Sequence, residues 1–386
     1  MNRRYSIVIA VVFLAIAGCR DKYNPSIHYP DTGYLVVEGF INSGQGPTQI
    51  KLSRTQALND PAGVQPERGA QVTVEGDDSG PFILNELSEG TYVNDQLQLH
   101  PSGKYRLHIG TANGKIYYSD FASPIKTPPI DSLNWIRESD GITIHVNTHD
   151  PQNNTHYYTW SFEETWEIDA TYVPNVKFVY DSEGKIIGTS YIYPDEAPDT
   201  SGHRCWKFGN STTILTASSA KLSQDVVHAP LIHIANKSEK LFVLYSALVS
   251  QHGVSPQGYE FLQRLKKNTE ETGSIFDSQP SELNNNIHNI ADSSEIVFGY
   301  VDVSDLQQSR VFIDSRDLDN WGFSQGCEYI PVYPRSNPDS LRAYSSYSPV
   351  DYISYNGFKA IGMATPVCVD CRLSGGINQR PSYWPR

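Results

Sequence analysis

The sequence has little methionine, few positive charges and no apolar run long enough to span a membrane. Only 2 methionines occur among 386 residues, against 24 tyrosines, and lysine plus arginine number 30 against 43 acidic residues, giving a formal net charge of −13. An acidic surface repels phosphate backbones, so we expect no nucleic-acid partner. The high tyrosine content, with many glycines and prolines, favours half-buried strands and turns over helices.

Signatures of several catalytic classes are missing as well. We find no H-E-x-x-H zinc motif, no Walker A loop and no dinucleotide-binding fingerprint. Glu163 and Glu164 are adjacent, so on a strand they point to opposite faces and cannot form a glycosidase pair by themselves. We expect a protein that is not an enzyme and holds no cofactor.

The one sustained apolar run lies at the start of the chain. Arg3 and Arg4 precede an apolar run over residues 7–17, followed by Gly18 and Cys19. The run is much shorter than the roughly 20 residues of a spanning helix and has the order of a signal peptide. Residues 16–19 read Ile-Ala-Gly-Cys and resemble a bacterial lipobox, so residues 1–18 are predicted to be a lipoprotein signal peptide and Cys19 the lipidated residue. Removal of Arg3 and Arg4 makes the net charge −15. Ordinary secretion with a free cysteine is the alternative.

The pattern after Cys19 predicts a tether and then two β-rich domains. Residues 19–33 are polar and contain proline and glycine, as expected for a tether. Strand-like stretches at 34–41, 48–55, 70–76, 80–86, 104–110 and 115–122 are separated by turn residues. They predict an immunoglobulin-like or transthyretin-like β-sandwich over residues 34–125. A Pro-rich linker is expected at 126–133, because Pro128 and Pro129 donate no ladder hydrogen bonds.

Residues 134–386 are predicted to form a larger β-rich domain with one inserted amphipathic helix. The segment HYYTWSFEETWEI (156–168) places Tyr158, Trp160, Phe162 and Trp166 on one face, which we interpret as core rather than a sugar platform. Residues 177–194 predict a hairpin that turns at 181–184. A helix is predicted near residues 255–272, because Ser255 can cap it and Pro256 suits its first turn.

Four cysteines besides Cys19 predict disulfides. They are Cys205, Cys327, Cys368 and Cys371. An even number in an exported chain favours disulfides, but sequence alone does not choose among the three pairings. A zinc site formed by all four cysteines, or redox chemistry at Cys368-x-x-Cys371, is the alternative. We expect the bonds to fasten a C-terminal tail in which Tyr383 and Trp384 are buried.

The histidines and a pair of aspartates suggest no metal site. His145 and His149 are four residues apart, and His228 and His233 are five apart. On a strand the first pair would stand about 13 Å apart, at about 3.3 Å per residue, which is too far for one ion. Asp77 and Asp78 precede Gly80 in a predicted turn, where such side chains bond the local backbone. A calcium site is the alternative there.

Several stretches together resemble one protein family. They are the lipobox, YLVVEGFINSGQGPTQIKLSRTQ (34–56), PPIDSL (128–133), YEFLQRLKKNTEETGSIFDSQPSELNNNIHN (259–289), VFGYVDVS (297–304) and CVDCRLSGGINQRPSYW (368–384). In this order they resemble the Bacteroidota lipoproteins called domain of unknown function 4249. The resemblance implies a lipid-anchored protein of the cell outer membrane, exposed at the surface and often encoded beside a TonB-dependent receptor. It supplies no catalytic residues.

The same resemblance implies two modification sites. Bacteroidota O-glycosylate exported proteins at Asp-Ser/Thr-aliphatic triplets, and Asp131-Ser132-Leu133 and Asp339-Ser340-Leu341 fit this pattern. Ser132 and Ser340 are therefore candidate glycosylation sites. An intact mass equal to that of the lipidated polypeptide alone would contradict this.

Three functions fit these observations. The leading hypothesis is a non-enzymatic outer-membrane lipoprotein that serves a TonB-dependent nutrient transporter, by capturing ligand or covering the barrel mouth. The second is a structural or adhesive cell-envelope protein. The third is a surface glycan hydrolase whose carboxylates converge only in the fold, and which would need two of them roughly 5 to 9.5 Å apart.

Overall fold

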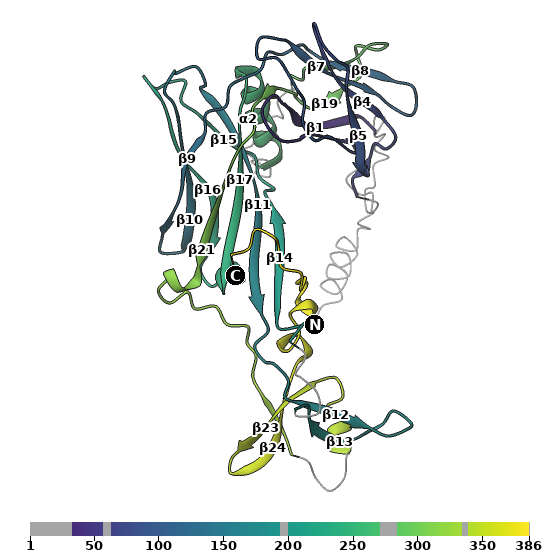
Figure 1. Ribbon diagram of the computed structural model, residues 1–386, viewed down its shortest axis with the longest axis vertical. Helices are drawn as coiled ribbons and strands as arrows, with labels where there is room; N and C mark the ends of the chain where they lie inside the picture. The colour runs from purple at the N-terminus through teal and green to yellow at the C-terminus, as the bar shows by residue number, and fades with distance from the viewer. Residues whose placement is uncertain (1–32, 57–62, 194–199, 271–283, 334–338, 386) are drawn as a thin grey trace, which may run out of the picture.

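The computed structural model describes residues 33–56, 63–193, 200–270, 284–333 and 339–385, which form three β-rich modules (Figure 1). The N-terminal module contains residues 33–122 with 287–304. The central sandwich contains residues 130–169, 204–253 and 307–314. The distal module contains residues 176–191 and 330–364. The N-terminal module lies beside one end of the long central sandwich, and the distal module lies at its other end. The prediction of a mostly β fold is confirmed.

One curved sheet of eleven strands forms the N-terminal module. Its strands are β1 (Leu35–Asn42), β2 (Thr48–Arg54), β3 (Gln65–Pro66), β4 (Gln71–Gly76), β5 (Phe82–Ser88), β6 (Thr91–Asn94), β7 (Tyr105–Gly110), β8 (Ile116–Ser119), β18 (Ile287–Asn289), β19 (Val297–Phe298) and β20 (Val303–Ser304). The order is β18-β8-β7-β4-β5-β6-β2-β1-β19, with β3 on β2 and β20 on β1. Six strands overlap the predicted stretches, whereas β3 and β6 were not predicted. Alternate residues point inward, so apolar side chains such as Leu35, Val37 and Leu107 fill one core.

A segment from late in the chain joins the two edges of this sheet. β18 pairs with β8 at one edge, and β19 pairs in parallel with β1 at the other. Gly299 has a φ of 150°, and a Cβ there would lie 2.4 Å from the carbonyl oxygen of Val37, so only glycine fits this crossing. Ile287, Val297 and Val303 are buried in the N-terminal core. Residues 287–304, which we had assigned to the C-terminal domain, therefore complete the N-terminal module.

Two facing sheets form the central sandwich. One holds β9 (Ile130–Arg137), β10 (Gly141–Asp150) and β16 (Asp225–Ala235), in the order β16-β10-β9. The other holds β11 (Tyr157–Asp169), β14 (Arg204–Asn210), β15 (Leu215–Ser218), β17 (Leu244–Gly253) and β21 (Gln307–Asp314), in the order β14-β11-β17-β21 with β15 on β11. Short 3₁₀ helices η1 (Glu239–Leu241) and η2 (Ser315–Asp317) follow β16 and β21. Residues 130–133 of the predicted linker are the beginning of β9.

The aromatic face of β11 lies in the core of the central sandwich. Tyr158, Trp160 and Trp166 are buried there, and Phe162 packs against them. The indole Nε1 of Trp160 donates to Gln251 Oε1 over 2.7 Å. The interpretation of this stripe as core is confirmed.

The predicted helix is α2 (Pro256–Glu270), which begins beside the buried carboxylate of Asp302. The backbone N–H and the hydroxyl of Ser255 donate to Asp302 Oδ2 over 3.0 and 3.1 Å, and the Ser255 hydroxyl accepts from Gly258 N–H. A Cβ at Gly258 would lie 2.2 Å from Asp302 Oδ2, so the close approach needs glycine. Phe261 is buried on this helix, and Tyr259 is half-buried. No helix among the described residues is long and apolar enough to cross a membrane.

The distal module is built from two segments far apart in sequence. It contains β12 (Val176–Tyr180), β13 (Ile186–Tyr191), β22 (Ile330–Val332), β23 (Ser348–Tyr355), β24 (Phe358–Ala364) and α3 (Asp339–Arg342). β12 and β13 form the predicted hairpin, with Gly184 at a φ of 76° in its turn. Five buried residues form a separate small core: Ile186, Val332, Leu341, Ile361 and Met363. The region predicted as one C-terminal domain thus contains two modules.

Two disulfides fix the segment that follows β24 of the distal module. Cys205 of β14 pairs with Cys371 in η4 (Cys371–Ser374), and Cys327 pairs with Cys368 in η3 (Pro366–Cys368). The prediction of disulfides is confirmed, and the structure supplies the pairing. Cys205 and Cys371 both lie in the core of the central sandwich, so the first bond fixes the start of the C-terminal tail.

The C-terminal tail runs back over the sheet that contains β11. Trp384 is buried against Trp206 and donates from Nε1 to Glu167 Oε2 over 2.7 Å. Tyr383 is 41% exposed, with the Arg310 guanidinium 3.8 Å from the centre of its ring. The prediction of a docked tail is right for Trp384. It is wrong for Tyr383, because the ring lies flat on the surface under that guanidinium.

Candidate functional site

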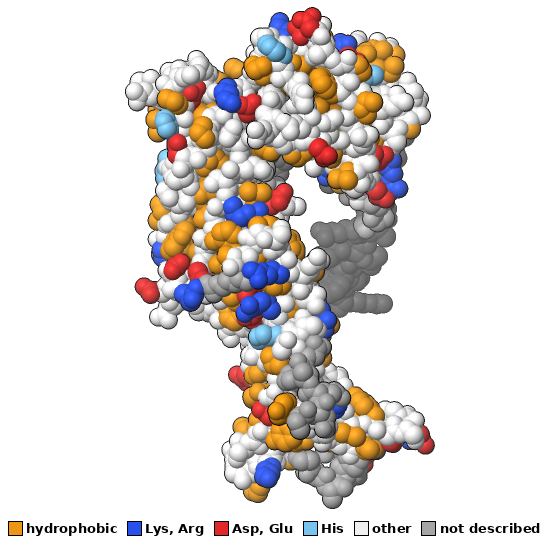
Figure 2. Space-filling model, viewed as in Figure 1, with side chains coloured by type: hydrophobic (Ala, Val, Ile, Leu, Met, Phe, Trp, Pro, Cys, Tyr) orange, Lys and Arg blue, Asp and Glu red, His pale blue; other side chains and the backbone are white. Residues whose placement is uncertain are grey.

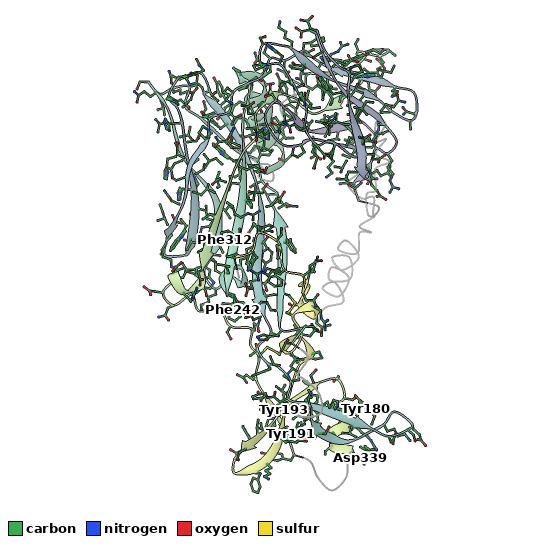
Figure 3. The ribbon with its side chains drawn as sticks, in the orientation of Figure 1. Tyr180, Tyr191, Tyr193, Phe242, Phe312 and Asp339 are labelled. Carbon is green, nitrogen blue, oxygen red and sulfur yellow. A yellow bond between two sulfur atoms is a disulfide. The ribbon has the colours of Figure 1, made fainter. Side chains whose placement is uncertain are left out.

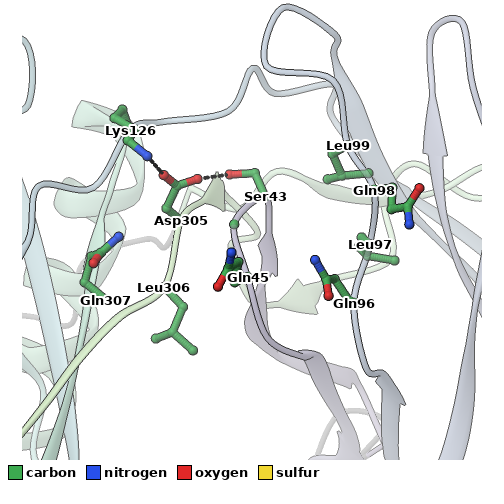
Figure 4. A pocket seen from close by; sticks show the side chains of 11 residues that line it. Ser43, Gln45, Gln96, Leu97, Gln98, Leu99, Lys126, Asp305, Leu306 and Gln307 are labelled. Carbon is green, nitrogen blue, oxygen red and sulfur yellow. Dashed lines mark hydrogen bonds and ion pairs between the residues drawn. The ribbon is translucent and has the colours of Figure 1, made fainter.

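A cleft of about 570 Å³ lies where the N-terminal module meets the central sandwich (Figure 4). Its walls come from the loop after β1, the segment after β6, the linker and the segment between β20 and β21. The lining residues are Ser43, Gly44, Gln45, Gln96, Leu97, Gln98, Leu99, Lys126, Asp305, Leu306 and Gln307. A cleft of this volume between two modules is a common setting for small-ligand sites.

Asn42 holds the loop that forms one wall of the cleft. Its side-chain Nδ2 donates to the carbonyl oxygens of Gln45 and Pro47, over 3.0 and 3.3 Å. Its Oδ1 accepts from the backbone N–H groups of Gly44 and Leu306, over 2.9 and 3.1 Å. One buried side chain therefore ties the β1–β2 loop to the opposite wall and sets the width of the cleft.

A single acid lies in the described lining of the cleft, and its charge is neutralised. Asp305 accepts from Lys126 Nζ over 2.5 Å and from the Ser43 hydroxyl over 2.8 Å. Lys126 is mostly exposed and Asp305 mostly buried. Because the described lining holds no second carboxylate, it lacks the acid pair that a glycosidase needs.

Four glutamine side chains give the cleft its chemical character. Gln45, Gln96, Gln98 and Gln307 line it, and none of these amides has a hydrogen-bond partner among the described residues. A primary amide offers both donors and an acceptor without net charge. Three leucines lie between them, and none of the described lining residues is aromatic. The arrangement suits an uncharged ligand that is rich in hydrogen-bonding groups.

The contact between the two modules beneath the cleft is closely packed. The ring of Phe40 in β1 stacks on His252 in β17 with the ring centres 4.3 Å apart, and His252 Nδ1 lies 3.0 Å from Ser304 Oγ. Burial lowers the pKa of His252 to about 4, against the smaller opposing effect of Asp305. The ring is therefore neutral at physiological pH, and the junction buries no unpaired charge there.

Of the three modification sites predicted from sequence, two lie among the described residues. Cys19 lies outside the described residues. Ser132 lies on β9, where its hydroxyl accepts from Asn147 Nδ2 over 3.0 Å, and Ser340 lies in α3. Glycosylation of these two serines stays a prediction.

The acidic pairs weighed from sequence do not form sites. Glu163 is exposed and Glu164 is buried, as expected for adjacent strand residues. Glu164 accepts from Lys240 Nζ over 2.6 Å and from the Tyr245 hydroxyl over 3.0 Å, which makes it a structural group. Asp77 Oδ1 accepts from the backbone N–H of Lys104, which is 27 residues away, rather than from the backbone of its own turn as predicted.

The sheet that contains β10 brings His145 and His228 into a pair that sequence spacing did not reveal. His145 stacks on His228 of the neighbouring strand rather than approaching His149. His233 Nδ1 lies 3.8 Å from Glu138 Oε2, and its Nε2 lies 3.9 Å from Asp140 Oδ2. The spacing argument considered only one strand at a time, and cross-strand neighbours depend on register.

Residues 322–326 form a G-x-S-x-G pattern, which we had expected to be absent together with the other catalytic motifs. A nucleophile elbow places the serine on a sharp turn between a strand and a helix. Ser324 instead lies in an irregular, exposed loop, where its hydroxyl accepts from the backbone N–H of Gly326 over 3.2 Å. No histidine among the described residues bonds it, so Ser324 lacks the geometry of a nucleophile elbow.

A set of exposed aromatic residues covers the distal module and was missed from sequence. Its members, called the distal aromatic set, are Tyr180, Tyr191, Tyr193, Tyr333, Tyr352, Tyr355 and Phe358. Figure 3 labels three of them, and Figure 2 shows hydrophobic side chains gathered on this module. Tyr191 packs edge-on against Tyr352 with ring centres 4.7 Å apart. The signal available in sequence was the alternation Tyr191-Ile192-Tyr193 beyond the hairpin, which a core strand would not need.

Comparisons with known proteins identify a family, and a distant solved structure is among the matches. A family model described as Domain of unknown function (DUF4249) matches residues 20–310. No curated protein matches the chain. A solved structure from Bacteroides uniformis, whose description gives carbohydrate binding as a provisional role, aligns at 9% identity over 57% of this chain and 90% of its own. The TM-score of that alignment is 0.13, so it carries no argument about the site.

Proposed function

Since this chain belongs to the DUF4249 family, whose function is unknown, we propose its role from its own surface: a non-enzymatic ligand-capturing protein of the outer membrane. It would be anchored through lipid on Cys19 and work beside a TonB-dependent receptor. The amide-lined cleft is the observation that carries the proposal.

The chemistry of the cleft supports binding rather than catalysis. Its four unpaired amides can each donate and accept, and its one carboxylate is already bonded to Lys126 and Ser43. Amides that gain partners only when a ligand arrives favour that ligand over a less polar one, because unpaired polar groups are costly once water is excluded. The ligand class that fits is an uncharged polar molecule, such as a neutral oligosaccharide or peptide.

Direct binding tests this role. The double variant Gln96→Ala/Gln98→Ala removes two of the amides, and Gln71→Ala removes an exposed glutamine of β4 away from the cleft. Calorimetry against neutral oligosaccharides and neutral peptides should find a ligand whose affinity falls roughly tenfold or more in the double variant, at about 1 kcal/mol per lost hydrogen bond. The Gln71 variant should bind like the parent. Equal binding by all three proteins would exclude the cleft as the ligand-binding site.

The distal aromatic set supports a protein partner. Tyrosines are enriched where proteins bind each other, and monomeric surfaces rarely gather so many exposed rings. Purification from outer membranes in mild detergent should bring down a large β-barrel receptor. Recovery of the protein alone would contradict the association with a receptor and leave ligand capture to be judged by calorimetry.

A structural or adhesive role is the second candidate, favoured by the same aromatic set. It predicts aromatic-dependent attachment to envelope proteins without any ligand for the cleft. The double variant Gln96→Ala/Gln98→Ala distinguishes the two roles, because it would weaken ligand binding but leave adhesion unchanged.

A further inference from the structure

A second hollow of about 510 Å³ lies beside the cleft, along the β5–β6 hairpin. Its lining includes Glu86 and Leu87 from β5 and Asp95 from the segment after β6. Gln96 lines both the second hollow and the cleft, so the two meet at its side chain. Each volume alone falls in the range of small-ligand sites. A ligand that fills both must therefore be longer than the cleft alone requires.

One chain segment forms a wall of both the cleft and the second hollow. Residues 93–96 line the hollow, and residues 96–99 line the cleft, where Figure 4 shows them in order. Asn94 holds the middle of this segment. Its Oδ1 accepts from the backbone N–H of Gln96 over 3.1 Å, and its Nδ2 donates to the carbonyl oxygen of Ile83 over 2.8 Å. Seven residues span at most about 24 Å, a length that an extended peptide of six or seven residues would match.

The second hollow is acidic, unlike the cleft. Glu86 and Asp95 are both exposed in its lining. The Glu86 carboxylate accepts from the backbone N–H groups of Gly90 and Gly69, over 3.0 and 2.9 Å, and these bonds hold the pKa of Glu86 below its usual range. Glu86 is therefore ionised at physiological pH, and Asp95 adds a second negative charge.

Arg68, the base that lies near Glu86, does not cancel this charge. Its Nη2 lies 2.5 Å from Glu89 Oε1, and both side chains are more than half exposed. One positive and three negative charges among Arg68, Glu86, Glu89 and Asp95 leave this part of the surface negative. The whole chain is acidic too, with a net charge of −13. A field of this sign favours a cationic group in the second hollow.

The uncharged side chains favour a peptide over a sugar chain. No aromatic residue is among the described residues that line the cleft or the second hollow. A sugar ring gains from packing its C–H face on an aromatic ring, and these linings offer none. The glutamine amides can instead pair with the N–H and C=O groups of a peptide backbone. Leu87, which is 76% exposed, and the leucines of the cleft offer contacts to aliphatic side chains.

We propose that the cleft and the second hollow together bind an extended peptide of about six residues, with neutral residues in the cleft and a lysine or arginine side chain in the hollow. The inference rests on the proposed role in ligand capture and narrows the ligand to basic peptides. Gln96 contacts the peptide where the two spaces meet, and Asp95 faces its cationic side chain. Because the hollow is open to solvent, this charge adds selectivity more than affinity.

The test uses capped synthetic hexapeptides and the full-length protein. A library with neutral residues at five positions and Lys, Gln or Glu at either end is passed over the immobilised protein, and mass spectrometry identifies the retained peptides. We expect Lys peptides to be retained most and Glu peptides least. Calorimetry on the best Lys peptide should then give a Kd about fivefold lower than for its Gln counterpart, because an exposed ion pair contributes up to about that factor.

Asp95→Asn tests the charge of the second hollow. It should reduce the difference between the Lys and Gln peptides to less than about twofold and leave the Kd of the Gln peptide unchanged. Asp78→Asn, at an exposed aspartate outside both linings, is the matched control and should change neither Kd. Gln96→Ala/Gln98→Ala should weaken the binding of both peptides. Thermal melts check folding, since substitutions at exposed positions shift stability little.

The contrary outcomes separate this inference from the proposed function. Equal binding of Lys and Gln peptides, or an unchanged preference in Asp95→Asn, would show that the second hollow takes no part, while ligand capture by the cleft stands. Binding of neutral oligosaccharides without binding of any peptide would overturn the peptide and again leave ligand capture standing. If neither peptides nor oligosaccharides bind, both the proposed function and this inference fail.

Discussion

The central sandwich buries many of its aromatic residues, whereas the distal module exposes its aromatic set to solvent. In the central sandwich Tyr158, Trp160 and Tyr245 are buried, within a core of 21 buried residues. The distal module has a core of five buried residues and displays its aromatic set to solvent, with Tyr193 72% and Phe358 68% exposed. A core this small stabilises little, since burial of apolar area is the main favourable contribution to folding.

The difference indicates that the two regions are stabilised in different ways. The central sandwich can hold its shape by packing, and it carries the N-terminal module and the cleft at one end. The disulfide between Cys327 and Cys368 lies beside the distal module, whose own core is small, so we expect this bond to add to its stability. Its exposed aromatic residues contribute little to stability, and under the proposed role they are available for contact with a partner.

The largest effect should come from the central core. Trp160→Ala removes a buried indole and leaves Gln251 Oε1 without its donor, so unfolding should become easier by about 3–5 kcal/mol. Trp160→Phe keeps most of the volume and should cost less. Chemical denaturation measures both variants. A loss below about 1 kcal/mol in Trp160→Ala would show that the central sandwich is not held by packing.

Removal of the disulfide should affect the distal module selectively. The bond between Cys327 and Cys368 closes a loop of 41 residues, which corresponds to about 2–4 kcal/mol of stabilisation. Cys327→Ser/Cys368→Ser should raise hydrogen exchange at β12, β13 and β22–β24, with little change in β10 and β11. Mass spectrometry of exchanged peptides reports this. Uniform loss of protection across both regions would show that they unfold as one unit.

Acid should weaken the junction end of the central sandwich and spare the distal module. The folded pKa of His252, about 4, lies below the value of about 6.5 in an unfolded chain, so the unfolded state binds the proton first as pH falls. Stability is therefore lost between about pH 6.5 and 4, by up to about 3 kcal/mol. His252→Gln can still bond Ser304 and should flatten this pH dependence in denaturation curves. If the free energy of unfolding of His252→Gln still falls with pH as it does in the parent, groups other than His252 cause the acid sensitivity.

The smallest effect on stability is expected from the distal aromatic set. Tyr193→Ser and Phe358→Ser should change the free energy of unfolding by no more than about 0.5 kcal/mol, because both side chains are largely exposed. Recovery of a receptor from membranes should nevertheless fall in both variants. Leu87→Ser, at a similarly exposed apolar residue of β5, is the control. A large loss of stability would mean that the rings pack within the module.

Local features were the most predictable from sequence. The hairpin at 181–184 and the beginning of α2 beside Ser255 follow from turn and capping chemistry, which acts over a few residues. The disulfides followed from an even number of cysteines in an exported chain, but their pairing did not. The return of residues 287–304 to the N-terminal module was not predictable, because a two-residue parallel strand such as β19 has no periodicity to read.

The sequence by itself determined the β-rich class, the positions of most strands and the formation of disulfides, because alternation, turn residues and cysteine number are properties of short segments. The tertiary structure alone decided the cleft and the stacked pair of His145 and His228. The cleft takes residues from four separate segments, and the pair depends on the register between β10 and β16. Both arise from packing between distant parts of the chain, which no local pattern encodes.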